Sequence, residues 1–349
     1  MHARSSSFKG LQSGKADPAV GHHEERNRPA RVLLPMNIHV IVNRRAGTVL
    51  DWETGPLREE ILGAFRANGH DVTLHLIAPE DLLETISKVM QVGCQALVVG
   101  GGDGTVRAAA AQLMGTDVPL GVLPLGTMNR LARDLKIPLS LPEAATVLAR
   151  SEVRAIDVAE VNGRIFLCNS TFGLPVVFSR YRQSVRGKPV WVRLKGYLSA
   201  LREILRSRRR MDLDIDHGHS RMRLRVLSMA VSNNRYIEKP SLMLEKNGLH
   251  HGVLAGYVSQ HPSGWAMARA VVRAMLGRFK TDPHIVLFEA HEIDISARRS
   301  RVRLSNDGEI ETIDLPLKYR IRPGALKVLV PANPSRTDAD RSEDLLLQH

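Results

Sequence analysis

The sequence has few cysteines, few aromatic side chains and no long apolar run, and each shortage excludes a class of protein. Its 349 residues contain two cysteines, Cys94 and Cys168, both in apolar, strand-like surroundings. They do not make a disulfide framework, and they favour a reducing, cytoplasmic compartment. No stretch of about 18 apolar residues is present, so we expect no transmembrane helix. Aromatic residues make up 4% of the chain, and neither an RNA-binding aromatic motif nor zinc-ligand spacing occurs.

Both ends of the chain also lack apolar segments. Residues 1–35 carry serines, glycines and charged residues, without the apolar core of about 7–15 residues that a secretory signal needs. We expect this segment to be a disordered tail, and Met36, immediately before the first apolar strand, is an alternative translation start. Residues 333–349 are polar and are expected to form a frayed tail.

Positive charge is in excess. The formal net charge is +13 and the sequence pI is near 10.2, which indicates an anionic partner, either nucleic acid or an anionic membrane surface. Because no nucleic-acid-binding motif accompanies the charge, we expect no specific nucleic acid partner. The alternative is that the excess only reflects an arginine-rich proteome.

The clearest local pattern is a strand, a glycine-rich turn and a helix. The apolar run Ala96–Val99 is followed by Gly-Gly-Gly-Asp-Gly-Thr at 100–105, and the alanine-rich segment Val106–Met114 predicts a helix. A turn with few side chains exposes backbone N–H groups beside a helix N-terminus, an arrangement typical of phosphate binding. The alternative is a tight turn that needs glycine only for its backbone angles. Four glycines around one acid are more than such a turn requires.

A second segment of the same kind follows at Leu120–Pro138. It again predicts a strand, a turn of small residues around Gly126 and Thr127, and a helix that Pro138 ends. No Walker lysine motif occurs, which excludes a P-loop enzyme. Successive parallel strands end at one edge of a sheet, so both turns are expected to meet where open α/β sheets bind ligands.

These segments belong to a predicted α/β domain at residues 36–150. Strands and helices alternate along it, which predicts a doubly wound parallel sheet with right-handed crossovers and a nucleotide-binding architecture. The other predicted elements are strands at 38–42 and 72–77 and helices at 57–67 and 82–92.

After residue 150 the pattern changes to short alternating runs separated by turns, typical of an antiparallel sheet or sandwich. We therefore expect a second, mainly antiparallel β-sandwich domain at residues 151–332. Its predicted strands are 154–161, 164–169, 211–215, 222–231, 253–259, 291–296 and 302–304. The sequence does not show whether the last segment, Gly324–Pro331, returns to the first domain.

Within the second domain, residues 191–211 predict a basic amphipathic helix. Seven arginines and lysines oppose a single acid, Glu203. The apolar positions recur at helical spacing and are Trp191, Leu194, Leu198, Leu201 and Leu205. Such a helix fits a membrane surface. An equally open alternative is a helix packed on the sheet with a solvated basic face. A second helix, Trp265–Phe279, is interpreted as part of the core.

Two motifs resemble those of one enzyme family. Gly-Gly-Asp-Gly-Thr at 101–105 and Pro-Leu-Gly-Thr-x-Asn-x-x-Ala-x-x-Leu-x-Ile-Pro at 124–138 resemble the catalytic domain of the diacylglycerol kinase and sphingosine kinase family of lipid kinases, in its soluble bacterial type. An Asp-Gly-Glu at 307–309 and an Arg-x-x-Pro-x-Ala-Leu-x-Val-x-x-Pro ending at 320–331 are similar to segments of the same family. The resemblance extends over about residues 36–331. Without it, residues 306–309 would be an ordinary hairpin turn.

The resemblance implies a kinase that uses ATP and Mg²⁺ and binds the nucleotide in a cleft between the domains. It implies that Glu309 is the general base toward a lipid hydroxyl. We interpret Asp103 as an unpaired acid in an electropositive turn that holds Mg²⁺ or orients the nucleophile; in the sphingosine kinase branch the corresponding acid has the role of base. The residues expected to bind the nucleotide are Asn43, Arg44, Arg45, Ala46, Gly47, Gly101, Gly102, Asp103, Gly104, Thr105, Val106, Arg107, Gly126, Thr127 and Asn129.

The chain departs from the family pattern at several of these places. The loop at 43–47 keeps Asn and Gly but lacks the family's Pro and Ser, and Arg130 stands where an aspartate is common. Arg107 and Ala108 replace an Asn-Glu pair. A Leu-Asp-Asp-Gly run that often binds a structural Mg²⁺ is replaced by Leu-His-His-Gly at 249–252. Because Mg²⁺ prefers carboxylate oxygens to imidazole, we expect this accessory metal site to be empty.

The sequence thus predicts an ATP-dependent lipid kinase that phosphorylates a hydroxyl of diacylglycerol or a related lipid. It is expected to be cytoplasmic and peripherally associated with the inner face of the membrane, and a homodimer is compatible with the sequence. The alternatives are a small-molecule kinase similar to NAD kinase, which shares the Gly-Gly-Asp-Gly turn, and a catalytically weak lipid or nucleotide sensor, which the departures suggest.

Overall fold

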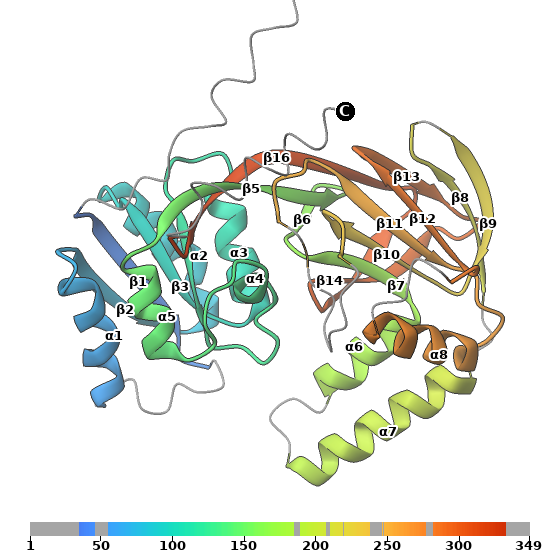
Figure 1. The fold of residues 1–349 in the computed structure, drawn as a ribbon, viewed down its shortest axis with the longest axis horizontal. Coiled ribbons are helices and arrows are strands. Elements are labelled where there is room, and N and C mark those ends of the chain that lie inside the picture. The colour runs from blue at the N-terminus through green and yellow to red at the C-terminus, as the bar shows by residue number, and fades with distance from the viewer. Residues whose placement is uncertain are drawn as a thin grey trace, which may run out of the picture. The chain divides into compact units, whose positions relative to one another are not determined.

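The computed structural model of the chain contains two lobes joined by a pair of long strands (Figure 1). It describes residues 35–45, 55–184, 189–206, 210–218, 220–237, 246, 248–276 and 282–332. Ala46 and Gly47, both predicted to bind the nucleotide, lie outside the described residues, as do the predicted tails at 1–34 and 333–349.

The N-terminal lobe is a parallel sheet in the order β2-β1-β3-β4. Its strands are β1 (Asn37–Asn43), β2 (Asp71–Ile77), β3 (Ala96–Gly101) and β4 (Leu120–Pro124). The central strand β3 is buried along its whole length, as expected for a parallel sheet covered on both faces. The predicted doubly wound α/β architecture is confirmed.

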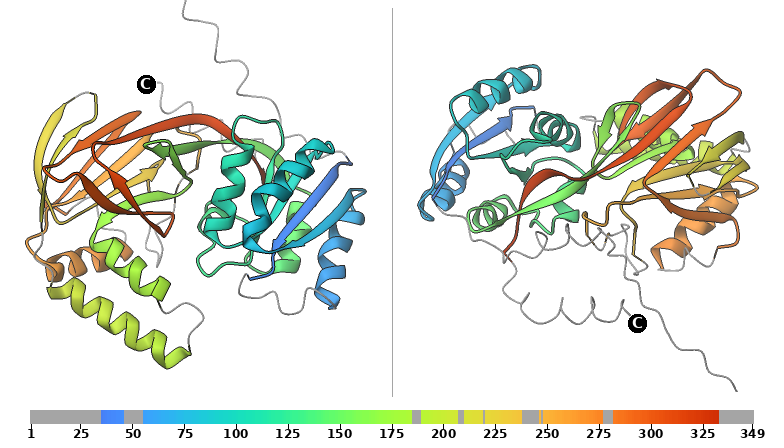
Figure 2. Two further views of the ribbon diagram at one scale, coloured as in Figure 1. Left: turned by 180° about the vertical axis from the view of Figure 1, so that it is seen from behind. Right: turned by 90° about the horizontal axis from the view of Figure 1, so that it is seen from above.

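Helices cover both faces of this sheet. They are α1 (Pro56–Arg66), α2 (Leu82–Gln91), α3 (Asp103–Leu113), α4 (Arg130–Asp134) and α5 (Leu141–Leu148), with a short 3₁₀ helix, η3 (Pro79–Asp81). Helix α1 contacts α5, and α2 contacts α3. The two pairs lie on opposite faces of the sheet (Figures 1 and 2).

The C-terminal lobe is a sandwich of two antiparallel sheets, which confirms the second predicted architecture. One sheet has the order β12-β11-β10-β7-β14-β15, and the other contains β16-β13-β8-β9. The strands are β5 (Glu152–Val161), β6 (Arg164–Phe166), β7 (Asn169–Gly173), β8 (Met211–Asp216), β9 (Arg221–Val226), β10 (Ser228–Asn233), β11 (Leu254–Ser259), β12 (Ile285–Ala290), β13 (Glu292–Ser296), β14 (Arg301–Asn306), β15 (Glu309–Asp314) and β16 (Leu317–Val330). Phe166, Phe172 and Tyr319 are the largest side chains of its core.

Strands β5 and β16 belong to both lobes. They pair with each other from Tyr319 opposite Val161 to Val330 opposite Glu152, with an irregularity between Arg322 and Leu326. One end of β16 pairs with β13 in the sandwich, whereas its other end pairs in parallel with β4 of the N-terminal lobe. The last segment of the chain therefore does return to the first lobe, where Leu326, Val328 and Leu329 join the core.

Several strand predictions differ from the structure. Residues 222–231, predicted as one run, form β9 and β10, which are separated by Leu227 and lie in different sheets. The predicted run 164–169 covers β6 and only the first residue of β7. Strands β7, β12, β15 and the first part of β16 were not predicted. Alternating apolar residues indicate a strand but not where the chain changes sheets, because both sheets of a sandwich present the same alternation to the core.

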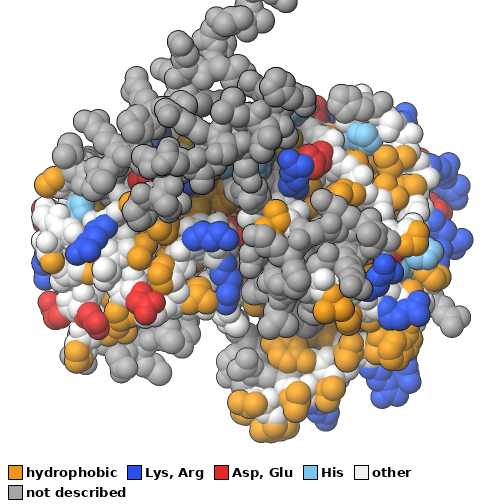
Figure 3. All heavy atoms as spheres, in the orientation of Figure 1, with side chains coloured by type: hydrophobic (Ala, Val, Ile, Leu, Met, Phe, Trp, Pro, Cys, Tyr) orange, Lys and Arg blue, Asp and Glu red, His pale blue; other side chains and the backbone are white. Residues whose placement is uncertain are grey.

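Three helices, α6 (Leu174–Ser184), α7 (Val190–Arg206) and α8 (Gly264–Met275), pack against one another beside the sandwich. Met211 is already in β8, so the helix predicted to extend to residue 211 is shorter. The interpretation of the second helix as core is wrong, because Trp265 is 64% exposed. Figure 3 shows hydrophobic side chains on the surface over α7, at the bottom of the view. Among the described residues, no helix is long and apolar enough to cross a membrane.

The loop at 248–252, the site of the accessory metal that the resemblance implies, is held by hydrogen bonds within the protein. The buried carboxylate of Asp157 accepts the backbone N–H groups of Gly252 at 2.6 Å and Gly324 at 2.9 Å. It also accepts the amide of Asn234 at 3.1 Å, and Asn234 in turn accepts the N–H of His251 at 3.1 Å. The described residues contain no cluster of three potential metal-ligating side chains. These N–H donors compensate the carboxylate charge as a cation would.

If protein hydrogen bonds alone hold this loop, chelation of metal with EDTA should leave the melting temperature unchanged in both the wild type and His251→Ala. Asp157→Asn should instead lower the free energy of unfolding by about 1–3 kcal/mol, because buried N–H groups lose a charged acceptor. Thermal unfolding with and without EDTA measures both. A melting temperature that falls on chelation in the wild type but not in His251→Ala would reveal a bound metal. That metal would be a transition metal, because imidazole is a ligand that transition metals prefer.

Candidate functional site

Two glycine-containing turns touch at the carboxyl edge of the parallel sheet. A Cβ atom added to Gly126, after β4, would lie 2.7 Å from Cα of Gly102, after β3, so the turns can approach this closely only without a side chain there. A Cβ added to Gly102 would have only Cα of Gly126 within 4 Å, at 3.9 Å. The backbone of the first turn therefore has open space beside it.

Helix α3 begins within the glycine-rich motif, earlier than predicted. Its first residue is Asp103, so Gly104 and Thr105 lie in the first turn of the helix. The N–H groups of such a turn point outward along the helix axis, where they can bind phosphate oxygens. Val106, predicted to bind the nucleotide, has its side chain in the core and donates its N–H to the carbonyl of Gly102 at 3.1 Å.

The carboxylate of Asp103 joins the two turns. Its Oδ1 accepts the backbone N–H of Arg130 at 2.8 Å, so the interpretation of Asp103 as an unpaired acid is wrong. Asn129, in the left-handed region at φ 49°, closes the second turn. Its Oδ1 accepts the N–H of Gly126 at 2.8 Å, and its Nδ2 donates to the carbonyl of the same residue at 2.9 Å. Thr127 is exposed at the tip of this turn.

Residues at the end of β1 lie beside the first turn. Asn43 donates its amide to the hydroxyl of Thr105 at 3.3 Å and accepts the N–H of Arg45 at 2.9 Å. Arg44 donates its Nε to the carbonyl of Leu76 at 3.2 Å, and Arg45 pairs with Glu80 at 3.0 Å. Of the predicted nucleotide-binding residues after β1, Asn43 thus contacts the first turn, whereas the side chains of Arg44 and Arg45 contact Leu76 and Glu80 instead.

A two-residue hairpin turn presents Glu309 from the other lobe. Asn306 pairs with Glu309 across β14 and β15, and the intervening Asp307 and Gly308 have φ values of 49° and 92°. Positive φ at both positions is characteristic of the tight hairpin turn that Asp-Gly favours. The buried carboxylate of Asp307 accepts three N–H groups, those of Leu167 at 2.7 Å, Cys168 at 2.8 Å and Asn169 at 3.1 Å.

The hairpin places the carboxylate of Glu309 beside the glycine-rich turn. A Cβ atom added to Gly104 would lie 3.6 Å from Cγ and 3.7 Å from Oε1 of Glu309. Gln183 of α6 donates its amide to Oε2 of Glu309 at 3.1 Å and to the carbonyl of Gly308 at 3.3 Å. The two predicted catalytic residues, Asp103 and Glu309, therefore lie at the same turn, although they come from different lobes.

Arginines connect the two lobes next to this site. Arg107, predicted to bind the nucleotide, pairs with Glu311 at 2.7 Å, and Arg164 pairs with the same carboxylate at 2.9 Å. Burial raises the pKa of Glu311, but the two arginines outweigh it and hold the pKa below its ordinary value of 4.5, so this carboxylate is charged at neutral pH. Arg130 donates to Oδ1 of Asn169 at 3.0 Å.

Sequence reasoning missed Gln183 and a buried lysine. Lys246, 1% exposed, donates to the carbonyl of Cys168 at 3.0 Å and lies 3.5 Å from the carboxylate of Asp134. Burial lowers the pKa of Lys246, but Asp134 and neighbouring groups raise it above its ordinary value, so the lysine stays protonated. Neither residue belongs to a motif or a periodic pattern, and only the fold brings them to their partners.

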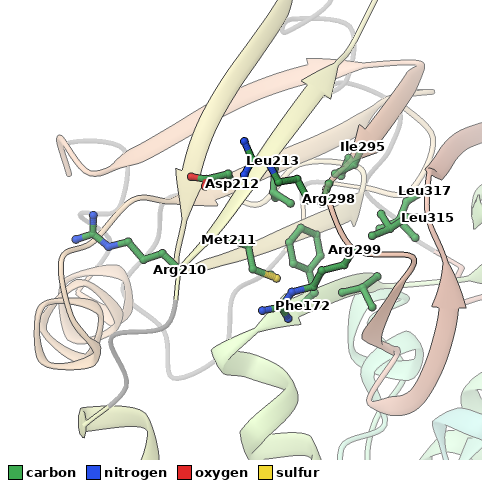
Figure 4. A pocket seen from close by; sticks show the side chains of 12 residues that line it. Phe172, Arg210, Met211, Asp212, Leu213, Ile295, Arg298, Arg299, Leu315 and Leu317 are labelled. Carbon is green, nitrogen blue, oxygen red and sulfur yellow. The ribbon is translucent and has the colours of Figure 1, made fainter.

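An open cavity lined by residues of the sandwich lies away from the space between Asp103 and Glu309. It has a volume of about 180 Å³. Figure 4 shows apolar side chains around it, including Phe172, Leu213 and Leu317, with three arginines beside it. The lining residues are Phe172, Arg210, Met211, Asp212, Leu213, Ile295, Ala297, Arg298, Arg299, Val302, Leu315 and Leu317.

The residues at the two turns fit the phosphates of ATP and its Mg²⁺. The open backbone at Gly102 and the N-terminus of α3 suit phosphate oxygens, and Asp103 offers a carboxylate oxygen of the kind that Mg²⁺ prefers. A magnesium ion bound with a nucleotide needs only one or two carboxylates besides the phosphates, so a single aspartate is sufficient.

Two family models match consecutive parts of the chain. The diacylglycerol kinase catalytic domain matches residues 37–161, and the YegS C-terminal NAD kinase beta sandwich-like domain matches residues 180–330. The first match contains both glycine turns, and the second contains Gln183 and Glu309.

Curated relatives match about a third of the chain. A Pseudomonas fluorescens protein called probable lipid kinase YegS-like is 40% identical over 123 residues, which are 34% of this chain and 41% of that protein. A Citrobacter koseri protein of the same name is 35% identical over 123 residues, with the same coverage of 34% and 41%. The chain thus spans well under half the length of these relatives.

A solved structure matches both lobes. A diacylglycerol kinase from Bacillus anthracis superposes with a TM-score of 0.67 at 20% sequence identity, and the match covers 88% of this chain and 99% of that one. At this identity the likeness concerns the fold alone. By the two model matches, residues 37–161 belong to the diacylglycerol kinase catalytic-domain family, and residues 180–330 belong to the family of YegS C-terminal domains.

Proposed function

We propose that this protein is a lipid kinase that transfers the γ-phosphoryl group of ATP to a hydroxyl of diacylglycerol or a related lipid. The observation that carries the proposal is the position of Glu309, whose side chain lies beside Gly104 in the first turn of α3. Bound phosphates would repel a carboxylate next to this turn. A chemical role, such as accepting a proton, explains why the carboxylate is nevertheless placed there.

The chemistry needs a phosphate cradle and a proton acceptor. The γ-phosphorus gains a bond to the lipid oxygen as its bond to the oxygen of ADP breaks, and the hydroxyl proton must leave. Glu309 accepts that proton, and because the transition state is loose, proton loss can come late and a carboxylate suffices. When bound, Mg²⁺ supplies positive charge that compensates the phosphate oxygens, and Asp103 is the residue that would hold it.

Gln183 is a positioning residue in this mechanism. Its amide donates to Oε2 of Glu309, which leaves Oε1 on the side of Gly104. Asp103 is a weaker candidate for the base, because its Oδ1 already accepts a backbone N–H that joins the two turns. This bond favours a structural and metal-holding role for Asp103.

The cavity of the sandwich supports a lipid acceptor. Phe172 on its wall lies three residues along β7 from Asn169, which contacts Arg130 at the site, a span of about 10 Å. We infer that an acyl chain occupies this apolar cavity while the glycerol hydroxyl lies at Glu309. NAD, the substrate of the rival small-molecule kinase, has no apolar chain for such a cavity.

Glu309→Gln keeps the shape of the side chain but cannot accept the proton, so lipid phosphorylation should fall by about a hundredfold or more while ATP binding is unchanged. Labelled ATP with dispersed diacylglycerol, followed by chromatography of the lipids, measures the product. Glu289→Gln, which removes an exposed carboxylate of β12, is the matched control and should retain activity. The comparison with Asp103→Asn decides the assignment: normal turnover by Glu309→Gln and loss in Asp103→Asn would move the base to the glycine turn.

Gln183→Leu removes the hydrogen bond to Glu309 with little change in size. We expect kcat for lipid phosphorylation to fall by about tenfold, with KM for ATP unchanged, because a misplaced group costs rate more than binding. In the double variant with Glu309→Gln, the loss should equal that of Glu309→Gln alone, since both changes remove one function. Additive losses would show that Gln183 acts independently of Glu309.

Val302→Trp should narrow the cavity of the sandwich. We expect the preference for short-chain over long-chain diacylglycerol to rise by about tenfold, while ATP binding stays as in the wild type. Leu287→Trp, at a partly exposed position of β12 in the same lobe, controls for the added indole. An unchanged chain-length preference in Val302→Trp would place the acyl chains outside this cavity.

A further inference from the structure

Helix α7 exposes the apolar face that a surface helix normally buries. The exposed fractions are 70% for Trp191, 60% for Leu194 and 58% for Leu198, whereas Ala200 on the opposite face is fully buried. The helix is thus folded against the protein through its small residue, with its large apolar residues facing solvent. Exposed apolar side chains that line up on one helix face indicate a surface that binds something.

Helix α8 extends this exposed surface. Trp265, Val272 and Leu276 are exposed by 64%, 56% and 59%. The two helices are in backbone contact, because a Cβ added to Gly264 would overlap the carbonyl oxygen of Ile204 in α7. On the inner side of α8, Ala270 is buried and Met267 accepts a hydrogen bond from the hydroxyl of Ser259 at 3.3 Å.

We name this region the α7–α8 surface. Figure 3 shows the hydrophobic side chains over α7 and α8 in the lower part of the view. The surface consists of Val190, Trp191, Leu194, Leu198, Leu201, Trp265, Val271, Val272 and Leu276.

Positive charges accompany the apolar residues. Exposed basic side chains on the two helices are Lys195, Arg202, Arg206, Arg269 and Arg273. Glu203 is the one acidic residue in the sequences of α7 and α8, and it pairs with Arg180 of α6 at 2.6 Å. The surface therefore combines large apolar side chains, two tryptophans and a net positive charge.

We propose that the α7–α8 surface docks on an anionic phospholipid bilayer. The apolar residues enter the boundary between headgroups and acyl chains, the tryptophans lie at that boundary, and the basic residues contact lipid phosphates. Helix α7, about 26 Å long, would lie in the plane of the membrane. A second copy of the chain is a poorer occupant, because two equally basic surfaces repel each other. This inference does not depend on the proposed phosphoryl transfer.

Co-sedimentation with vesicles tests the proposal in the absence of ATP. The probes are vesicles of phosphatidylcholine alone and of phosphatidylcholine with phosphatidylglycerol in equal parts. We expect wild-type protein to bind the mixed vesicles and to lose binding as sodium chloride rises. Leu194→Gln with Leu198→Gln, both at exposed positions, should weaken binding by at least about tenfold, and so should Arg202→Glu with Arg206→Glu.

A matched control keeps the charge change but moves it elsewhere. Arg221→Glu with Arg225→Glu reverses two exposed arginines of β9 and should leave vesicle binding nearly unchanged. Brominated phosphatidylcholine in the mixed vesicles should quench the tryptophan fluorescence of the wild type, and Trp191→Phe with Trp265→Phe should abolish that quenching.

Three results would overturn the proposal. One is equal sedimentation of the wild type and the Leu194 and Leu198 variant, and another is equal loss of binding in the β9 control. The third is dimerisation of the wild type in lipid-free solution that the Leu194 and Leu198 changes abolish, since the surface would then bind a second copy. The docking variants should still phosphorylate a dispersed short-chain diacylglycerol, so a failure of docking and a failure of the proposed function give different results.

Discussion

The carboxylate of Asp307 is the contact on which the candidate site depends. It accepts three backbone N–H groups from the segment that joins β6 to β7, each a charge-assisted hydrogen bond worth about 1.5–3 kcal/mol. The same residue occupies the left-handed position that makes the hairpin turn tight. Glu309, two residues later, thereby acquires a fixed position relative to Asn169, and through Arg130 relative to the second glycine turn. In the motif at residues 307–309, Asp307 thus anchors the hairpin, Gly308 completes the turn, and Glu309 is the base that we propose.

The opposite side of the site is fixed in a similar way by small residues and backbone contacts. Gly102 and Gly126 allow the two turns to touch, and Asp103 and Asn129 hold them through hydrogen bonds to backbone N–H groups. The side chains of Asp103 and Asn129, which the sequence suggests as ligand-binding groups, therefore also hold the backbone of the two turns in place. This arrangement leaves the backbone beside Gly102 open, and we propose that an anionic ligand binds there.

The fold was largely predictable because its signals are local. A buried apolar run followed by a glycine turn and a helix is visible within 19 residues, as at 96–114, and repetition of this unit implies a parallel sheet. The partners of Asp307, Gln183 and Lys246 were not predictable, because each joins segments that are distant in sequence and carries no periodic signal. The exposure of the apolar face of α7 could not be predicted from the sequence either. Helical spacing identifies an apolar face, but whether a neighbour covers that face depends on the tertiary arrangement.

The strand β16 has a consequence for how the protein is made. The hydrophobic core of the N-terminal lobe includes Leu326, Val328 and Leu329 of β16. This lobe is synthesised first, but it is incomplete until β16 has left the ribosome. One edge of β4 therefore stays unpaired while the whole sandwich is synthesised. An unpaired apolar edge is prone to associate with other chains. The nascent protein should therefore depend on chaperones during translation more than its size alone suggests.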